Sequence, residues 1–408
     1  MRKIYYTLAI SMVIFSINHC FANSESFNLF IDKVLNNSTS VKIKELELEA
    51  EGYRAKQTEY FYLPKVSATS KIKNNKEPAD GSLTATSLIY DSALMHRFSE
   101  KNLKLKISEL ALNKEKEELY TAVTGNLIGI HFLSELTKST TKLHHNAQDI
   151  FNLINRRYNS GVAKISDVEQ ATLLMQRIET ERKNIEKEIE QYKSNIEVIS
   201  GITFPKEGVN IPSRLIKNLK STFIDNDHTN QNIDYNMLKM QADAIKENAY
   251  QQNSLFSINL VAEEKYAEQK RSHNESYIGL DLKVNVFDID KIFSESAQLK
   301  TYAAVQKKAD YKYQELTAKI KNLKLISSSN QSELAGLQEQ RNTMYSIIKS
   351  QEREYSISQS SFYEMVNTLF DILTIERRIA ELTISDIKNK MEYIQLIGNI
   401  NEIKKLHQ

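Results

Sequence analysis

One layout of segments occurs twice along this chain, and it restricts the possible folds more than any other feature of the sequence. Each copy has a helical stretch, a β-hairpin, a very long helical stretch, a break and a second long helix. The copies align at an offset of 197 residues, which pairs Tyr90 with Phe287, Asp91 with Asp288 and Tyr158 with Tyr355. Such self-similarity indicates a repeated structural unit. We therefore predict two repeats, at residues 23–201 and 233–408, joined by a mixed segment at residues 202–232.

The chain is poor in the residues that make turns. It has 10 glycines and 4 prolines in 408 residues, which is about 3% against roughly 12% in average proteins. Long uninterrupted helices must therefore form most of it. This composition disfavours nucleotide-binding α/β enzymes, immunoglobulin-like sandwiches and disordered linkers. Charged residues make up 26% of the chain and its mean hydropathy is −0.47, which excludes a helical protein with many membrane spans.

The first 22 residues have the pattern of a secretory signal peptide. Arg2 and Lys3 precede an apolar run over residues 4–17, and Ala22 precedes the expected cut. The run would span roughly 21 Å of helix, which is short of the roughly 30 Å hydrocarbon core of a membrane. Removal would take away the single cysteine and leave 52 basic and 52 acidic residues. A neutral exported chain argues against nucleic acid as a partner and has no thiol for disulfide chemistry.

Two β-rich segments, at residues 61–90 and 256–287, have the pattern of hairpins. Residues alternate in the second hairpin, with a polar set at Asp281, Lys283 and Asn285 and an apolar set at Ile278, Leu280, Leu282, Val284 and Val286. Four strands are too few for a barrel that spans a bilayer, since the smallest have about eight, but three chains would supply 12. The pattern therefore predicts an oligomeric outer-membrane barrel, with the apolar set facing lipid and the polar set lining water. The alternative is a sheet in a soluble protein.

The long helices have the spacing of coiled coils. From Val168 to Ile199, apolar residues recur at steps of three and four, interrupted at Arg182, which is typical of knobs-into-holes packing. Breaks at residues 156–167 and 355–364 predict two helical tips. A plain two-stranded coiled coil has the same spacing, but such a rod does not contain β-hairpins in register with its helix breaks.

The first tip carries a motif that resembles a known family. Residues 157–171 read Arg-Tyr-Asn-Ser-Gly-Val-Ala-Lys-Ile-Ser-Asp-Val-Glu-Gln-Ala, which is close to the pattern R-[FY]-x-x-G-x-x-x-x-x-D-V-x-x-A of the TolC family of outer-membrane factors. Together with the signal peptide and the duplicated layout, the resemblance covers nearly all of the mature chain. It implies a mainly α fold with a small antiparallel β part. In such a fold a homotrimer forms a 12-stranded β-barrel continuous with a periplasmic α-helical barrel.

The resemblance also implies a function. Members of the family lie in the outer membrane of Gram-negative bacteria and form the passive exit duct of a tripartite export system, for type I protein secretion or for efflux of drugs or ions. Their partners are a periplasmic adaptor protein and an inner-membrane ABC or proton-driven pump. They use no catalytic residue, metal or cofactor. The alternative function is that of a periplasmic or surface coiled-coil structural protein without a pore.

Positions that match the family's motif supply candidate site residues. Adaptor docking is expected at Gly161, Val162 and Ala163 in the first tip and at Ser358 in the second, while the entrance and its constriction are expected at Asp167, Tyr355, Ser360, Glu364 and Asn367. Ser358 and Ser360 stand where the family usually has glycine and arginine. A threefold ring of Glu364 would favour cations, although this residue also suits the solvated start of a helix. Gly161 equally suits a plain helix C-cap.

No other motif points to chemistry. The histidines lack the spacing of metal ligands, and the sequence contains neither a nucleophile elbow nor a phosphate-binding loop. Aromatic residues bracket the hairpins, which predicts either a membrane-interface girdle or ordinary strand propensity. These aromatic residues are Phe61, Tyr62, Tyr90, Phe256, Tyr277 and Phe287.

Overall fold

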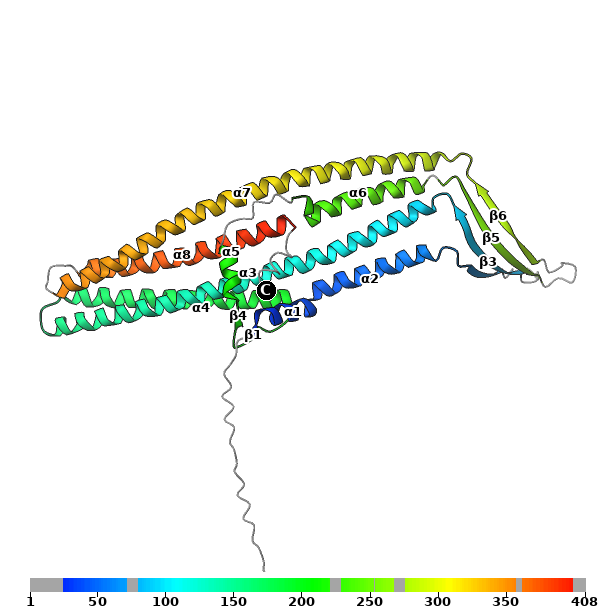
Figure 1. The fold of residues 1–408 in the computed structure, drawn as a ribbon. Coiled ribbons are helices and arrows are strands. Elements are labelled where there is room, and N and C mark those ends of the chain that lie inside the picture. Colours follow the sequence, from blue (N-terminus) through cyan, green and yellow to red (C-terminus); the bar gives the residue numbers. More distant parts are fainter. Residues whose placement is uncertain are drawn as a thin grey trace, which may run out of the picture.

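The computed structural model describes residues 25–71, 80–220, 229–252, 254–267, 276–356 and 362–398. The described chain is elongated, with a β-sheet at one end and the ends of long helices at the other (Figure 1). The predicted signal peptide, residues 1–22, lies outside the described residues.

Two successive sets of helices and strands account for this shape. The first set comprises α1 (Phe27–Asn37), α2 (Thr39–Glu59), β2 (Lys65–Lys71), β3 (Asp80–Asp91), α3 (Leu94–Asn159) and α4 (Ile165–Ser200). The second set comprises α6 (Ile233–Gln251), β5 (Phe256–Ala267), β6 (Ser276–Val284), α7 (Ile289–Ser356) and α8 (Phe362–Leu396). Between them lie β4 (Val209–Asn210), α5 (Ser213–Lys220) and the 3-10 helix η1 (Thr229–Gln231), and β4 pairs in parallel with β1 (Glu25–Ser26).

The scarcity of glycine and proline allows α3 and α7 to extend over 66 and 68 residues, or roughly 100 Å each. Gly129 within α3 serves packing, because a Cβ at this position would come within 2.8 Å of the Tyr192 ring of α4. The helical stretch expected before the first hairpin is two helices. Ser38 separates them because its backbone is extended (φ −62°, ψ 126°).

The four long strands form one antiparallel sheet in the order β2-β3-β5-β6. The helices nearest the sheet follow the same order, since α2 packs on α3, α3 on α6 and α6 on α7. Each strand therefore continues a helix at the corresponding place in the helical layer (Figure 1). In the described residues, β2 and β6 each pair on one side only, so they are the edges of the sheet.

Side chains separate by polarity across this sheet. Directly paired residues of antiparallel strands lie on the same face, so the strand register defines two faces. The apolar face comprises Val66, Ala68, Leu83, Ala85, Tyr90, Phe256, Ile258, Leu260, Ala262, Ile278, Leu280, Leu282 and Val284. The polar face comprises Lys65, Ser67, Thr69, Thr84, Thr86, Asn259, Glu263, Lys265, Asp281 and Lys283. The exceptions are Ser70, Ser87, Glu264 and Ser276 on the first face and Leu88, Val261 and Tyr277 on the second.

Buried apolar side chains form two clusters. One lies near the middle of the molecule, where α1 and α5 meet α3, α4 and α8. The other lies toward the tips, where α3 and α4 pack with α7 and α8. None of the described helices has both the length and the apolar character needed to cross a membrane. The fold class is the predicted one, a mainly helical chain with a small antiparallel sheet.

Candidate functional site

The residues predicted to face lipid are exposed although they are apolar. Ile278, Leu280, Leu282 and Val284 lie side by side on the apolar face and are 79, 63, 61 and 57% exposed in the single chain. The last member of the predicted set, Val286, lies outside the strand because β6 ends at Val284. The apolar face thus presents a continuous surface that the single chain leaves uncovered.

Asn285 also departs from its predicted place on the polar side of the strand. Its backbone N–H donates to Leu255 O (2.8 Å), and its side-chain amide donates to Ser254 O (2.7 Å). These two bonds tie the end of β6 to the start of β5. Asn285 therefore closes the joint between sheet and helices instead of lining the polar face.

Asp91 is the centre of this joint. Its carboxylate accepts hydrogen bonds from Ala93 N (2.9 Å) and Ser254 Oγ (2.7 Å) and pairs with Arg97 (2.5 Å). The side chain is 5% exposed, and three donors compensate for the burial of its charge. The joint fixes how β3 passes into α3 and how α6 passes into β5, which sets the angle between sheet and helices.

The first tip turns through a Schellman motif. Gly161 has φ 76°, a left-handed conformation that favours glycine. Gly161 N donates to Tyr158 O (2.9 Å) and Val162 N donates to Arg157 O (2.9 Å), which satisfies the last carbonyls of α3. Val162 is 73% exposed. Ala163, the third predicted docking residue, follows directly in the same turn and is partly buried.

Asp167 has a local role at the start of α4. Its carboxylate accepts a hydrogen bond from Lys164 N (3.3 Å), which caps the helix. In the described part of the chain, no hydrogen bond joins Asp167 to Tyr355, and their role in an entrance stays a prediction.

Tyr355 instead connects the two repeats through a residue that sequence reasoning missed. It is 7% exposed at the end of α7, packs on Phe362 of α8 (centroids 6.2 Å apart) and lies under the guanidinium of Arg157 of α3 (4.4 Å to the ring centroid). An arginine over an aromatic ring is attractive and more so when partly desolvated. The predicted residues Ser358 and Ser360 lie outside the described residues.

Glu364 and Asn367 lie three residues apart in the first turns of α8, and both are exposed. Residues at this spacing share one face of a helix. An acidic residue in the first turn also stabilises the positive end of the helix dipole. The position of Glu364 is therefore compatible with both predicted roles, and the constriction ring stays a prediction.

A charged cluster joins α8 to α4 above the tips. Arg377 of α8 donates to Glu181 and to Glu188 (2.5 Å) of α4 and to Glu381 (2.9 Å) of its own helix. Burial alone would lower the pKa of the Arg377 guanidinium, but the hydrogen bonds to the three carboxylates outweigh it and raise the pKa. These contacts connect residues almost 200 positions apart, so no local pattern in the sequence could have indicated them.

Arg377→Gln is expected to lower the melting temperature of the protein, because three carboxylates would lose their shared cation. Charge-assisted hydrogen bonds of this kind contribute roughly 1.5–3 kcal/mol each. Arg378→Gln is the matched control, since Arg378 pairs only with Glu333 (2.8 Å) at an exposed site, where a pair contributes at most about 1 kcal/mol. Circular dichroism during heating measures both variants. Equal shifts for the two would contradict a special role for the cluster.

A buried ion pair lies where α8 passes the middle of the molecule. Lys390 and Asp386 are 3% and 5% exposed and 2.9 Å apart. Asp386 also accepts from Ser327 Oγ of α7 (2.5 Å), and Lys390 donates to Lys220 O at the end of α5 (3.0 Å). The pair thus holds α5, α7 and α8 together. In the sequence it is an ordinary pair at a spacing of four, which is why its burial was not predicted.

The described residues contain no group of three or more histidine, cysteine, aspartate and glutamate side chains placed to hold a metal ion. The polar clusters described above consist of ion pairs and hydrogen bonds within the chain.

Known proteins resemble this chain in sequence and in fold. Residues 30–197 match the family model described as outer membrane efflux protein. CusC, for which transmembrane channel formation is described, has 12% sequence identity and a TM-score of 0.76 over 91% of each chain. VceC, an outer membrane protein of Vibrio cholerae, has 14% identity and a TM-score of 0.73 over 91% of this chain and 95% of its own.

CmeC, an outer membrane channel of Campylobacter jejuni, has 12% identity and a TM-score of 0.71 over 93% of this chain and 89% of its own. At these identities the solved structures establish similarity of fold. No curated protein matches the chain.

Proposed function

We propose that this chain, whose residues 30–197 match the family model described as outer membrane efflux protein, is a member of that family and the outer-membrane exit duct of a tripartite export system. The observation that carries the proposal is the sheet, whose two faces differ in polarity over all four strands. A sheet with one apolar and one polar face suits a barrel wall between lipid and water. The duct supplies no energy, so small-molecule efflux and type I protein secretion are both compatible with it.

The unpaired edges of the sheet support assembly as a homotrimer. Within the described residues, β2 and β6 each have one edge without a partner, and a lipid-exposed sheet edge is not tolerated in a membrane. Pairing β6 of one copy with β2 of the next would close 12 strands from three copies. The adjoining edge helices support the same closure, since Tyr53 of α2 and Tyr311 of α7 are 71% and 69% exposed.

The tips are the proposed contact with a periplasmic adaptor, which would connect the duct to an inner-membrane pump. They lie at the end of the molecule opposite the sheet (Figure 1). Val162 stands at the first tip with most of its surface exposed. A structural coiled coil without a pore would leave the segregation of the sheet faces without a purpose, which makes it the less favoured function.

The proposal is tested on the full-length protein purified from the outer-membrane fraction. We expect a trimer in detergent, with a central lumen visible by electron microscopy, and ion conductance after insertion into a planar bilayer. A monomer without a lumen, or recovery of the chain in the soluble periplasmic fraction, would refute the duct and favour the structural protein.

A further inference from the structure

A second apolar surface begins where the apolar face of the sheet ends. The segment between β6 and the second turn of α7, residues 286–293, reads Val-Phe-Asp-Ile-Asp-Lys-Ile-Phe. We call it the α7 entry segment. Its apolar side chains are largely exposed: Val286 91%, Phe287 76%, Ile289 52%, Ile292 45% and Phe293 68%. An exposed apolar patch of this extent marks a surface that contacts something.

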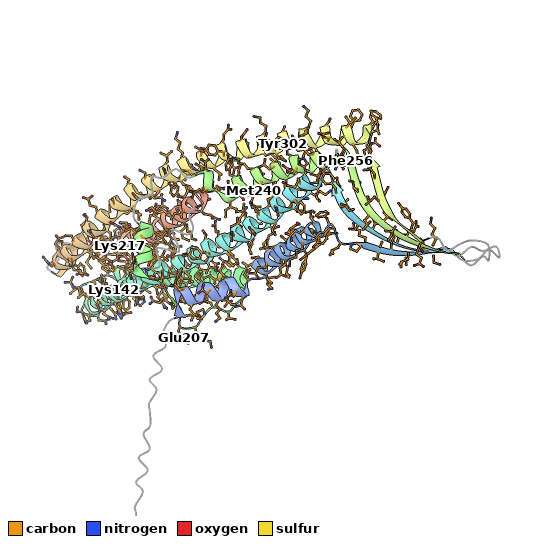
Figure 2. The ribbon with its side chains drawn as sticks, turned by 45° about the vertical axis from the view of Figure 1, so that its right-hand side comes forward. Lys142, Glu207, Lys217, Met240, Phe256 and Tyr302 are labelled. Carbon is orange, nitrogen blue, oxygen red and sulfur yellow. The ribbon has the colours of Figure 1, made fainter. Side chains whose placement is uncertain are left out.

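Aromatic side chains lie at the same level on the other three strands. Tyr62 precedes β2, Tyr90 ends β3 and Phe256 begins β5, and all three are exposed. Tyr90 and Phe256 stack on the apolar face with ring centroids 5.3 Å apart. Figure 2 shows Phe256 at the point where the helices end and the sheet begins. Aromatic residues at the ends of strands are typical of membrane interfaces.

Asp288 and Lys291 of the α7 entry segment bond to each other. Asp288 caps the helix, because its carboxylate accepts from Lys291 N (3.2 Å) and its backbone carbonyl accepts from Ile292 N (3.3 Å). The Lys291 ammonium lies 3.8 Å from the same carboxylate. A helix start that is already capped can enter a headgroup layer at little cost in lost hydrogen bonds.

The direction in which Ile292 points follows from a hollow on the layer of helices. This hollow has a volume of about 560 Å³ and is lined by residues of all four helices nearest the sheet, including Glu51 of α2 and Gln298 of α7. Ile292 precedes Gln298 by six residues, which places it roughly 120° away around α7. Ile292 therefore does not point toward this hollow.

A second copy of the chain packing edge to edge would cover Phe293 more directly than Ile292. The side of α7 that packs on α6 includes the buried residues Ala309 and Leu316. Phe293 lies roughly 150° from that side, where a neighbouring copy would pack, whereas Ile292 lies roughly 110° from it. An edge contact thus accounts more directly for the exposure of Phe293 than for that of Ile292.

We propose that the α7 entry segment lies in the phospholipid headgroup layer of the periplasmic leaflet, so that membrane contact extends beyond the sheet onto the first two turns of α7. The inference rests on the proposed function, because it requires the sheet to be in the membrane. Phospholipid is the occupant because exposed apolar side chains continue from Val284 at the end of the apolar face to Val286 and Phe287. Lys291, partly exposed within the segment, suits lipid phosphates.

The chain has no tryptophan, so a single introduced tryptophan reports on its own surroundings. Three variants compare depths: Leu280→Trp on the apolar face, Ile292→Trp in the α7 entry segment, and Ala303→Trp, which is exposed on the same side of α7 but roughly 16 Å further from the sheet. Each trimer is reconstituted in phosphatidylcholine vesicles with or without bromine on the acyl chains. Bromine quenches tryptophan fluorescence on contact.

We expect bromine to quench Leu280→Trp and Ile292→Trp roughly twofold or more, with Ile292→Trp most sensitive to bromine close to the headgroup, and to leave Ala303→Trp unchanged. Quenching of Leu280→Trp without Ile292→Trp would overturn the inference and keep the duct. Equal quenching of Ile292→Trp and Ala303→Trp would also overturn it, because the boundary would lie elsewhere. Absence of quenching in all three would refute the membrane-embedded sheet itself.

Discussion

A chain with arginine in place of Leu280 is expected to be missing from the outer membrane as a trimer, whereas a chain with arginine in place of the adjacent Asp281 is expected to assemble. Leu280 lies on the apolar face opposite Leu260, and Asp281 lies on the polar face opposite Asn259. Arginine on the lipid face near the bilayer midplane costs roughly 2–4 kcal/mol per copy, while substitutions facing the lumen mainly tune selectivity. Three copies per trimer multiply that cost.

The paired design removes the ambiguity of a single variant. The same new side chain is placed at neighbouring positions of one strand, so both variants carry the same guanidinium on opposite faces. The change in net charge is larger for the variant expected to assemble, +2 at Asp281 against +1 at Leu280, so added charge alone would not explain the expected loss. The amount of heat-dissociable trimer in the outer-membrane fraction is the measurement. Loss of both trimers, or survival of both, would show that the two faces of β6 are not those of a barrel wall.

The faces of the sheet could be predicted from the sequence because side chains of a strand alternate strictly between two sides. Ile278, Leu280 and Leu282 follow that rule over several residues, and the structure places them on one face. The end of the same strand could not be predicted in this way. It depends on Asn285 bonding to Ser254 and Leu255, about 30 residues earlier in the chain, and local alternation carries no information about such a contact.

The helical tips also combine a local feature that the sequence predicts with a contact between repeats that it does not predict. The glycine turn of the first tip was predictable, because Gly161 is the residue that a left-handed helix end favours, and the structure has it in that conformation. The contact of Arg157 with Tyr355 could not be predicted from the sequence, because it joins the two repeats and depends on how the coils pack. Spacing along one helix predicts which face is apolar, but it does not identify the polar partner on another helix.

Lys390→Met is expected to destabilise the protein strongly. Methionine nearly matches the length of the lysine stem, so packing is largely retained. The buried Asp386 carboxylate, however, would lose its cation and keep only the hydroxyl of Ser327. Removing one partner of a buried pair costs roughly 3–5 kcal/mol, because an uncompensated charge remains in the interior. The carbonyl of Lys220 at the end of α5 would also lose its donor.

The double variant Asp386→Leu with Lys390→Met decides whether charge is the cause. Replacing both partners of a buried pair with apolar side chains is often nearly neutral, so we expect the double variant to recover most of the melting temperature that Lys390→Met loses. Lys388→Met is the matched control, since Lys388 lies two residues away and is only partly buried against Tyr192 (3.3 Å to its hydroxyl). If the double variant were as unstable as Lys390→Met, the hydrogen bond to α5 would hold the middle of the molecule together, and the ion pair would not.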